Sequence, residues 1–125
     1  MPKAPTAGDG WAVADLDALG EGPGFRKVRK ALGVTAFGAH AVILPPGYTT
    51  PRHAHERQEE LYLVLDGEIE FDFDGDKHTL GPGGIVRVSP ATMRSLRNAS
   101  DSAEATYLAV GGADGYVGRD GVRPD

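Results

Sequence analysis

Glycine and proline divide this chain into short segments, and this spacing constrains the fold more than any other feature. The 125 residues include 18 Gly and 9 Pro. They recur in turn-forming combinations, which are PPG at 45–47, DG at 66–67 and 74–75, and GPGG at 81–84. Such spacing is typical of short strands joined by tight turns. The sequence therefore predicts an all-β sandwich or barrel with no helix of normal length.

The segments between these turns carry the patterns of strands. We expect strands over 25–32, 35–44, 61–65, 68–72, 85–89, 93–98 and 105–110. The Asp66-Gly67 and Asp74-Gly75 pairs are hairpin signals, because type I′ turns favour these residues. A short helical turn is expected over Asp15–Leu19, and the glycines that follow should end it.

The length of the chain fits one domain. We divide it into an N-terminal extension over residues 1–24, a β-barrel over 25–112 and a C-terminal tail over 113–125. The tail shows little periodicity, so we expect it to drape over the barrel or to fray.

Composition excludes several classes of function. Thirteen Lys and Arg against 18 Asp and Glu give a net charge of -5, which argues against a nucleic-acid partner. No apolar run approaches the roughly 20 residues that cross a bilayer, and the first residues do not resemble a secretory signal. We therefore expect a cytoplasmic protein with no membrane partner. The chain has no Cys, so any metal must be held by His, carboxylate or water.

Two histidines one residue apart, His53 and His55, precede an acidic turn and an apolar segment. On a strand they would project from one face, because side chains alternate with a period of two. A turn over 56–59 would bring Glu60 back beside them. Two imidazoles and one carboxylate form a facial triad, which leaves positions open for water or substrate. Two exposed histidines beside a solvated acidic turn fit the same residues.

The spacing around these residues resembles the first motif of the cupin superfamily. The pattern in this chain is Gly47, five residues, His53, one residue, His55, four residues, Glu60, six residues, Gly67. The resemblance extends over about residues 32–110, and it implies an antiparallel jelly-roll β-barrel with a metal inside the barrel mouth. Glu59 fits a shorter variant of the pattern only with the last glycine out of register, so Glu60 is assigned as the ligand.

The segment 83–98 resembles the second cupin motif but departs from it at a functional position. Asn98 fits the pattern, whereas Arg94 stands where the motif has its histidine, and Ser89-Pro90-Ala91 fits the Pro-x-Gly turn poorly. A guanidinium has no lone pair to offer, so Arg94 cannot replace the imidazole as a ligand.

Three arrangements are open for Arg94, besides an outward-pointing strand residue. The three remaining ligands can hold a metal with extra waters. Alternatively, the metal is lost and Arg94 forms a salt bridge to Glu60 across the barrel. In the third, Arg94 lies beside a metal and binds an anionic substrate through a bidentate contact.

Other side chains receive simpler interpretations. Tyr62 should face the cavity with Glu60, where it can orient a ligand or pack. His40 is expected in a strand as a hydrogen-bonded wall residue, and His78 in an exposed turn. Gln58 is expected in a solvated turn at the barrel mouth. The expected core residues are Phe37, Phe71, Phe73, Val86, Val88 and Leu96.

The leading functional hypothesis is a small cupin that binds a divalent metal through His53, His55 and Glu60. Iron, manganese, nickel, zinc and copper all suit this ligand set. As an enzyme it would be a dioxygenase or an isomerase, with Arg94 and Tyr62 acting on a small, anionic ligand. The alternative is a non-catalytic cupin module, with or without a metal, that binds a small molecule or has a regulatory role. Similar cupins suggest a homodimer, in which residues 25–32 form a paired edge.

Overall fold

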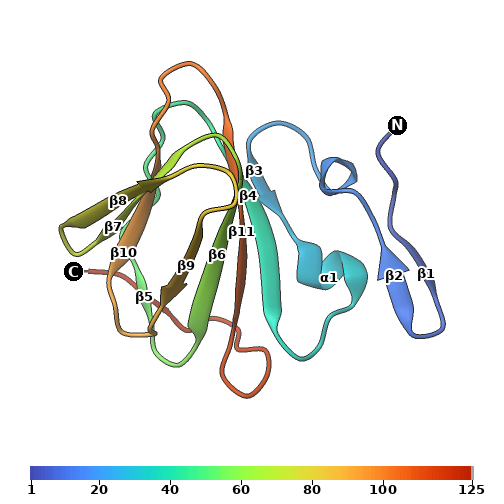
Figure 1. The fold of residues 1–125 in the computed structure, drawn as a ribbon. Helices are drawn as coiled ribbons and strands as arrows, with labels where there is room; N and C mark the ends of the chain where they lie inside the picture. Colours follow the sequence, from blue (N-terminus) through green and yellow to red (C-terminus); the bar gives the residue numbers. More distant parts are fainter. Residues whose placement is uncertain (125) are drawn as a thin grey trace.

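The computed structural model describes residues 1–124 and has a mostly β architecture (Figure 1). Its strands are β1 (Thr6–Gly8), β2 (Trp11–Val13), β3 (Gly24–Arg26), β4 (Gly38–Leu44), β5 (Ala54–His55), β6 (Glu59–Asp66), β7 (Ile69–Phe73), β8 (Asp76–Leu80), β9 (Ile85–Val88), β10 (Arg94–Asn98), β11 (Ala105–Gly112) and β12 (Gly121–Val122). Over residues 1–124 the helical elements are a 3-10 helix at Leu16–Ala18 and the short helix α1 (Val28–Leu32). The expected all-β fold and the short helical turn are both confirmed.

Two antiparallel sheets face each other and form the barrel. The larger has the order β3-β4-β11-β6-β9, and the smaller has the order β10-β7-β8. A backbone bridge between His53 and Arg94 connects the β5 segment to β10, and β12 pairs with β5. Figure 1 shows α1 against the side of β4, with the β1-β2 hairpin beyond it and apart from the barrel. No helix among residues 1–124 is long and apolar enough to cross a membrane.

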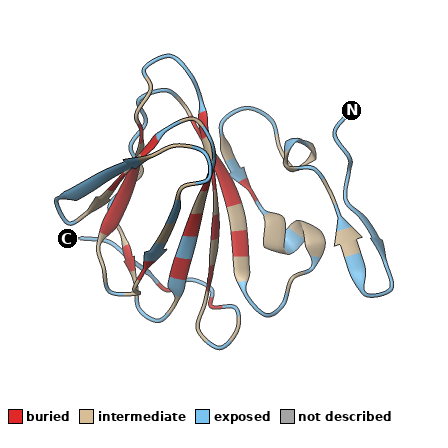
Figure 2. Cartoon of the chain, viewed as in Figure 1, coloured by how far each residue is buried: buried red, intermediate tan, exposed pale blue. Residues whose placement is uncertain are grey.

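The core lies between the two sheets and follows the two-residue alternation of the strands. Its buried residues are Val42, Leu44, Tyr62, Val64, Ile69, Phe71, Val88, Leu96, Ala105, Tyr107 and Ala109. Figure 2 shows the buried positions alternating with more exposed ones along β4 and β6. Phe73 and Val86 pack against this cluster and are half-buried. Burial of each large side chain contributes about 1.5–3 kcal/mol, so the inner faces of the strands determine the fold.

The two Asp-Gly pairs have different roles. Asp74 and Gly75 have φ angles of 54° and 102° and join β7 to β8 in the expected hairpin. The hairpin prediction for Asp66-Gly67 is wrong, because β6 and β7 belong to different sheets. Gly67 has a φ of 74°, so the pair does form a tight turn. An Asp-Gly pair specifies only the backbone conformation of a turn, and it does not specify that the flanking strands pair.

Two further expectations are wrong. The strand predicted over 25–32 ends at Arg26, and residues Val28–Leu32 form α1. Gly33, in the left-handed region at φ 74°, ends this helix, and its N–H donates to the carbonyl of Arg29. Phe37 is 42% exposed and not part of the core. It precedes the first residue of β4, so the inward and outward alternation of that strand does not apply to it.

Small residues on β11 leave space inside one end of the barrel. Ala109 lies opposite both Tyr62 on β6 and His40 on β4, and Gly111 lies opposite Glu60. A Cβ atom at Gly111 would lie 2.6 Å from the Gln58 side-chain oxygen and 3.1 Å from Cγ of Glu60. Position 111 therefore needs glycine for Glu60 to take its place in the barrel.

Asn98 stabilises the opposite end of the barrel through hydrogen bonds to the backbone. Its side chain is fully buried, and Nδ2 donates to the carbonyls of Leu44, Pro45 and Ala103 at 3.1, 3.1 and 2.8 Å. Its Oδ1 accepts the N–H of Ser100 at 2.9 Å. One side chain thus satisfies backbone groups from two loops, which gives the asparagine of the second motif a structural role.

We expect Asn98→Ala to lower the free energy of unfolding by about 2–4 kcal/mol, because it leaves buried carbonyls without a donor. Urea denaturation at neutral pH measures this change. Thr79→Ala, at an exposed position of β8, is the matched control and should change stability by less than about 0.5 kcal/mol. Equal stabilities of the two variants would contradict the structural role of Asn98.

Candidate metal centre

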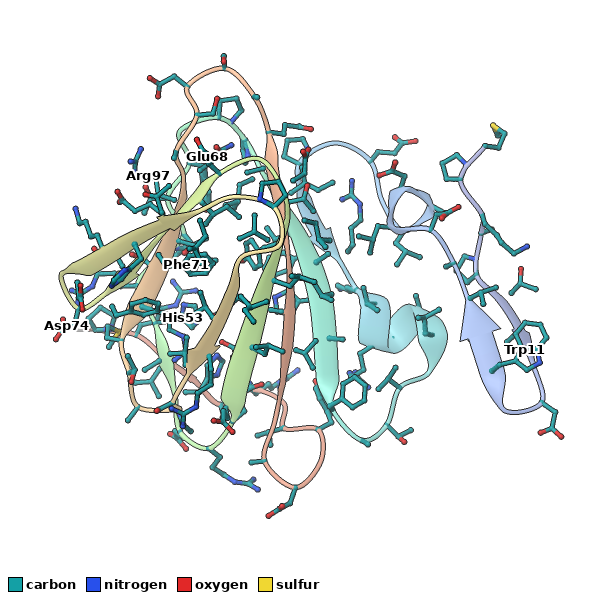
Figure 3. All side chains as sticks on the ribbon, viewed as in Figure 1. Trp11, His53, Glu68, Phe71, Asp74 and Arg97 are labelled. Carbon is teal, nitrogen blue, oxygen red and sulfur yellow. The ribbon has the colours of Figure 1, made fainter. Side chains whose placement is uncertain are left out.

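The chain brings His53, His55 and Glu60 together at the open end of the barrel. One potential ligand atom from each residue lies within 4.8 Å of the other two. The Nε2 atoms of His53 and His55 lie 4.0 and 3.2 Å from Oε1 of Glu60. In the view of Figure 3, His53 lies between β10 and β9, in the space that the strands enclose. The neighbouring Glu59 points outward and pairs with Arg87, so Glu60 is the residue beside the histidines.

Hydrogen bonds to the outer ring nitrogens fix both imidazoles. Nδ1 of His55 lies 2.8 Å from a carboxylate oxygen of Asp120, and Nδ1 of His53 lies 3.3 Å from the carbonyl of Pro51. The amide nitrogen of Gln58 also lies 3.1 Å from Nδ1 of His55, but the shorter contact is with the Asp120 carboxylate, which can only accept. The acceptors Asp120 and Pro51 therefore favour a proton on each Nδ1. The lone pair of each Nε2 then points to the cavity, which is the tautomer that metal-binding histidines adopt.

The contact between His55 and Glu60 needs a cation or a proton. Nε2 of His55 is buried and has no hydrogen-bond partner among the described residues, yet it lies 3.2 Å from Oε1 of Glu60. With the proton on Nδ1, two lone pairs face each other across this distance. A metal ion or a second imidazole proton removes the repulsion. The donor set and its geometry therefore fit a metal ion that suits nitrogen and oxygen ligands.

Arg94 points into the barrel and is 1% exposed, which rules out the outward-pointing arrangement. Its Nη2 atom lies 2.5 Å from Oε1 of Glu60. Its Nη1 atom donates to the carbonyl of Thr92 at 2.8 Å, with the carbonyls of Ser89 and Pro90 at 3.4 and 3.3 Å. The guanidinium is thus held by Glu60 and by the turn before β10, and the salt bridge across the barrel is present.

Tyr62 completes the surroundings of the same carboxylate. Its hydroxyl donates to Oε1 of Glu60 at 2.7 Å and lies 3.5 Å from Nε of Arg94. Burial raises the pKa of Glu60, but its contacts with His55, Tyr62 and Arg94 outweigh burial and hold its pKa at about 2. Glu60 is therefore ionised at neutral pH.

The two histidines differ in how easily they lose a proton. Burial lowers the pKa of His53, and the hydrogen bond to Pro51 only partly offsets this effect. Burial also opposes protonation of His55, but its contacts with Glu60 and Asp120 outweigh burial and raise its pKa. His53 is therefore neutral at pH 7, whereas His55 competes for a proton.

A cavity of about 970 Å³ opens from this centre, and His53, His55, Glu60 and Tyr62 line it. His40 also lines it, in line with Val42 and Leu44 as expected. Arg94 is not among the lining residues. His78 is exposed as expected, but the expectation that it lies in a turn is wrong, because it is part of β8.

Five basic residues line the same cavity, and within the described residues Glu60 is the one carboxylate in its wall. These residues, which we call the basic rim, are Lys27, Arg29, Lys30, Arg119 and Arg123. Three come from α1 and the residue before it, and two come from the C-terminal tail. The chain as a whole has a net charge of -5, so the positive charge around the cavity is opposite in sign to the net charge of the protein.

Asp120 is the site residue that the sequence did not indicate. It comes from the C-terminal tail, 65 residues after His55, and is 7% exposed. Burial raises its pKa, but the backbone N–H groups of Gln58 and Arg57 outweigh burial and lower it. Gln58, expected in a solvated turn, also lines the cavity and bonds to Asp120. The one sequence signal near Asp120 is the pair of glycines at 118 and 121, which allow the tail to bend and to approach another segment of the chain closely.

Comparison with known proteins identifies the relatives of this chain. It is 36% identical over 61 residues to a β-D-galactosidase of Mycobacterium tuberculosis, covering 49% of this chain and 51% of the relative. It is 30% identical over 66 residues to an uncharacterized protein of Methanocaldococcus jannaschii, covering 53% and 52%. The chain thus spans about half the length of the curated relatives it matches.

Solved structures with the same fold include a cupin protein from Bacteroides fragilis, with 25% identity, a TM-score of 0.63, and coverage of 73% of this chain and 75% of that one. A protein from Acidithiobacillus ferrooxidans described as a sugar phosphate isomerase has 27% identity, a TM-score of 0.62, and coverage of 70% and 56%. The cupin domain family matches residues 40–111, which include the whole histidine and glutamate centre. The chain, with its jelly-roll barrel, belongs to the cupin family.

Proposed function

We propose that this cupin holds a divalent transition-metal ion with His53, His55 and Glu60 and binds a small anionic ligand in the cavity beside it. The observation that carries the proposal is the approach of Nε2 of His55 to Oε1 of Glu60 at 3.2 Å, with Asp120 on the other ring nitrogen. Iron, manganese, nickel, zinc and copper all suit two imidazoles and a carboxylate. When bound, such an ion supplies Lewis acidity or activation of dioxygen.

The charge of the centre favours an anionic ligand. Arg94 already neutralises Glu60 through the 2.5 Å ion pair, and His53 and His55 bind a metal in their neutral forms. A dication added to this centre would leave it with excess positive charge in a partly buried place. The basic rim adds to this charge at the mouth of the cavity. A carboxylate or phosphate group is therefore the ligand chemistry that fits.

The contacts of Arg94 and Tyr62 favour an indirect role for both. Arg94 directs its donors at Glu60, Tyr62 and backbone carbonyls, and it does not line the cavity. Tyr62 lines the cavity but gives its proton to Glu60. We propose that both residues fix the carboxylate of Glu60, and that the basic rim binds the anionic group.

For the reaction, we propose isomerisation of a small anionic sugar derivative. Support comes from the Acidithiobacillus protein described as a sugar phosphate isomerase and from the galactosidase relative, whose names both concern sugars. The second candidate is a metal-free binding module, and the buried Arg94–Glu60 ion pair is the observation that favours it. In that case His55 is protonated between Glu60 and Asp120, and metal binding separates the two candidates.

We expect metal ions to bind and stabilise the wild-type protein. At a concentration of 100 times Kd, iron(II), manganese(II) or zinc(II) should add about 2.7 kcal/mol to the free energy of unfolding. Affinity should fall as pH drops from 8 to 6, because the raised pKa of His55 means that a proton competes with the metal. Isothermal calorimetry on protein without a histidine tag measures both effects.

His53→Ala and His55→Ala should abolish this binding, whereas His78→Ala, which removes an exposed histidine, should not change it. Equal metal affinities for all three variants would show that the ion binds elsewhere. If no metal stabilises the wild type at any pH between 6 and 8, the metal-free binding module is the correct function.

Replacement of Arg94 by histidine tests the position of the missing fourth ligand. Arg94 and His53 face each other across a backbone bridge, so the side chain of a histidine at position 94 would leave the backbone next to the proposed metal site. We expect Arg94→His to raise metal affinity by about tenfold or more, because it adds a ligand and removes a nearby positive charge. Competition with a fluorescent chelator measures the change.

Arg97→His is the matched control for this substitution. Arg97 lies on the same strand, is half-buried and contacts Glu70 on β7, away from the metal centre. Its replacement should leave metal affinity unchanged. An equal gain in the two variants, or none at position 94, would contradict the placement of Arg94 in the ligand slot.

The basic rim predicts selective binding of phosphorylated sugars. The metal-loaded protein should bind glucose 6-phosphate more tightly than glucose, by about tenfold or more, because the rim can form charge-assisted hydrogen bonds with the phosphate. The double variant Lys30→Ser/Arg123→Ser, which removes one rim residue from α1 and one from the tail, should lose most of this preference and leave metal affinity unchanged. Calorimetry at low and high salt measures both ligands, and equal affinities in the wild type would exclude a phosphate-binding role for the rim.

A further inference from the structure

We propose that the C-terminal tail completes the metal centre and that Asp120 is a positioning residue, which holds His55 in its metal-binding tautomer. This inference rests on the proposed metal site. It adds Asp120 to the residues that form the metal centre, although Asp120 lies outside the matched cupin region, which ends at residue 111. It also assigns a function to a segment that carries no motif.

The carboxylate of Asp120 makes four contacts with one short stretch of chain. Its Oδ1 atom lies 2.8 Å from Nδ1 of His55 and accepts the side-chain amide of Gln58 at 2.7 Å. Its Oδ2 atom accepts the backbone N–H groups of Arg57 and Gln58 at 3.0 and 2.9 Å. Besides His55 at the end of β5, these partners are Arg57 and Gln58 in the turn between β5 and β6, which is the turn that brings Glu60 back to the histidines. Asp120 therefore controls the turn as well as the ring.

The backbone around Asp120 adds to the same connection. Its carbonyl accepts the N–H of Glu56 at 3.0 Å, and the next residue, Gly121, pairs with His55 in the β5-β12 ladder. Arg119 has a φ of 55°, a left-handed conformation that costs about 1–2 kcal/mol for a non-glycine residue. The contacts of Asp120 offset that cost, so the bend before it is held by the bonds to the β5-β6 turn.

A second contact fixes the tail nearer its start. The guanidinium of Arg29 in α1 lies 3.9 Å from the ring centre of Tyr116, and Val117 is buried. The tail is thus held at Tyr116 by α1 and at Asp120 by the metal centre. With both ends of the segment fixed, the Asp120 carboxylate has a defined position relative to His55.

The chemistry of the pair gives Asp120 its role. A carboxylate can only accept, so it requires the proton of His55 on Nδ1 and leaves the Nε2 lone pair free for a metal. An amide at the same position can turn its NH₂ group to Nδ1. The ring would then carry its proton on Nε2, pointing at Glu60, and that proton would have to leave before a metal binds.

Asp120→Asn is the test, because it keeps the size of the side chain and changes its hydrogen-bonding pattern. We expect metal affinity, measured by chelator competition, to fall by about 10–100-fold. In the metal-free protein at pH 8, ¹⁵N chemical shifts of His55 should show Nδ1 protonated in the wild type and Nε2 protonated in the variant. Asp114→Asn, an exposed change in the same tail, is the control and should alter neither readout.

Each outcome decides a separate question. Unchanged metal affinity in a folded Asp120→Asn variant would overturn the positioning role, as would a wild-type His55 that carries its proton only on Nε2. If the variant does not fold, the ¹⁵N measurement on the wild type still decides the tautomer. Failure of the wild type to bind metal would reject the proposed function, while the ¹⁵N measurement would still test the contact between Asp120 and His55.

Discussion

The Oε1 atom of Glu60 is the atom on which the rest of the site depends. It accepts hydrogen bonds from Tyr62 and Arg94 at 2.7 and 2.5 Å and faces His55 at 3.2 Å. Glu60 lies on the larger sheet and Arg94 on the smaller, so this ion pair joins the two halves of the barrel. Each charge is buried, and neither would be tolerated without the other, since an unpaired buried charge is strongly destabilising.

The same ion pair modifies what the carboxylate can offer a metal. In a four-ligand centre the charge of the glutamate acts on the ion alone, whereas here Arg94 already takes part of it. No guanidinium contacts Nε2 of His55, which has no hydrogen-bond partner among the described residues, and Asp120 binds the opposite side of the ring. In the proposed metal site the imidazoles would therefore carry more of the binding than the carboxylate, and metal affinity would depend on how firmly their rings are held.

Local patterns predicted the parts of the fold that depend on neighbouring residues. The alternation along β6 identified the inward Tyr62, and the spacing from Gly47 to Gly67 identified the three residues that come together as a candidate metal site. The segment 28–32 was predicted wrongly, because alternating residues look alike in an edge strand and in a short helix. Phe37 was predicted wrongly because it lies just before β4, where the alternation of that strand does not apply. Whether an Asp-Gly turn joins two strands of one sheet or passes between sheets is decided by tertiary packing.

The contacts of Asp120 could not be predicted from the sequence, for a different reason. Its partners, His55, Arg57 and Gln58, lie more than 60 residues earlier, so no window of sequence contains both sides of the contact. Arg94 lies 34 residues from Glu60, yet their salt bridge was one of the arrangements expected, because a known motif links the two positions. Long-range contacts are visible in a sequence only when such a pattern already links their two ends.

The candidate metal-site residues lie inside the region that matches the family, and the residues proposed to bind the anionic ligand lie outside it. The three metal-site residues lie within the matched residues 40–111, whereas the basic rim and Asp120 come from segments before and after them. Membership of the family accounts for the barrel and the candidate metal centre within it, and it does not account for the charges at the cavity mouth. α1 and the tail bring those charges to the site, and the Arg29–Tyr116 contact ties the two segments together. The proposed anionic ligand therefore depends on the charges that these two segments bring, because the barrel shared with the relatives does not determine it.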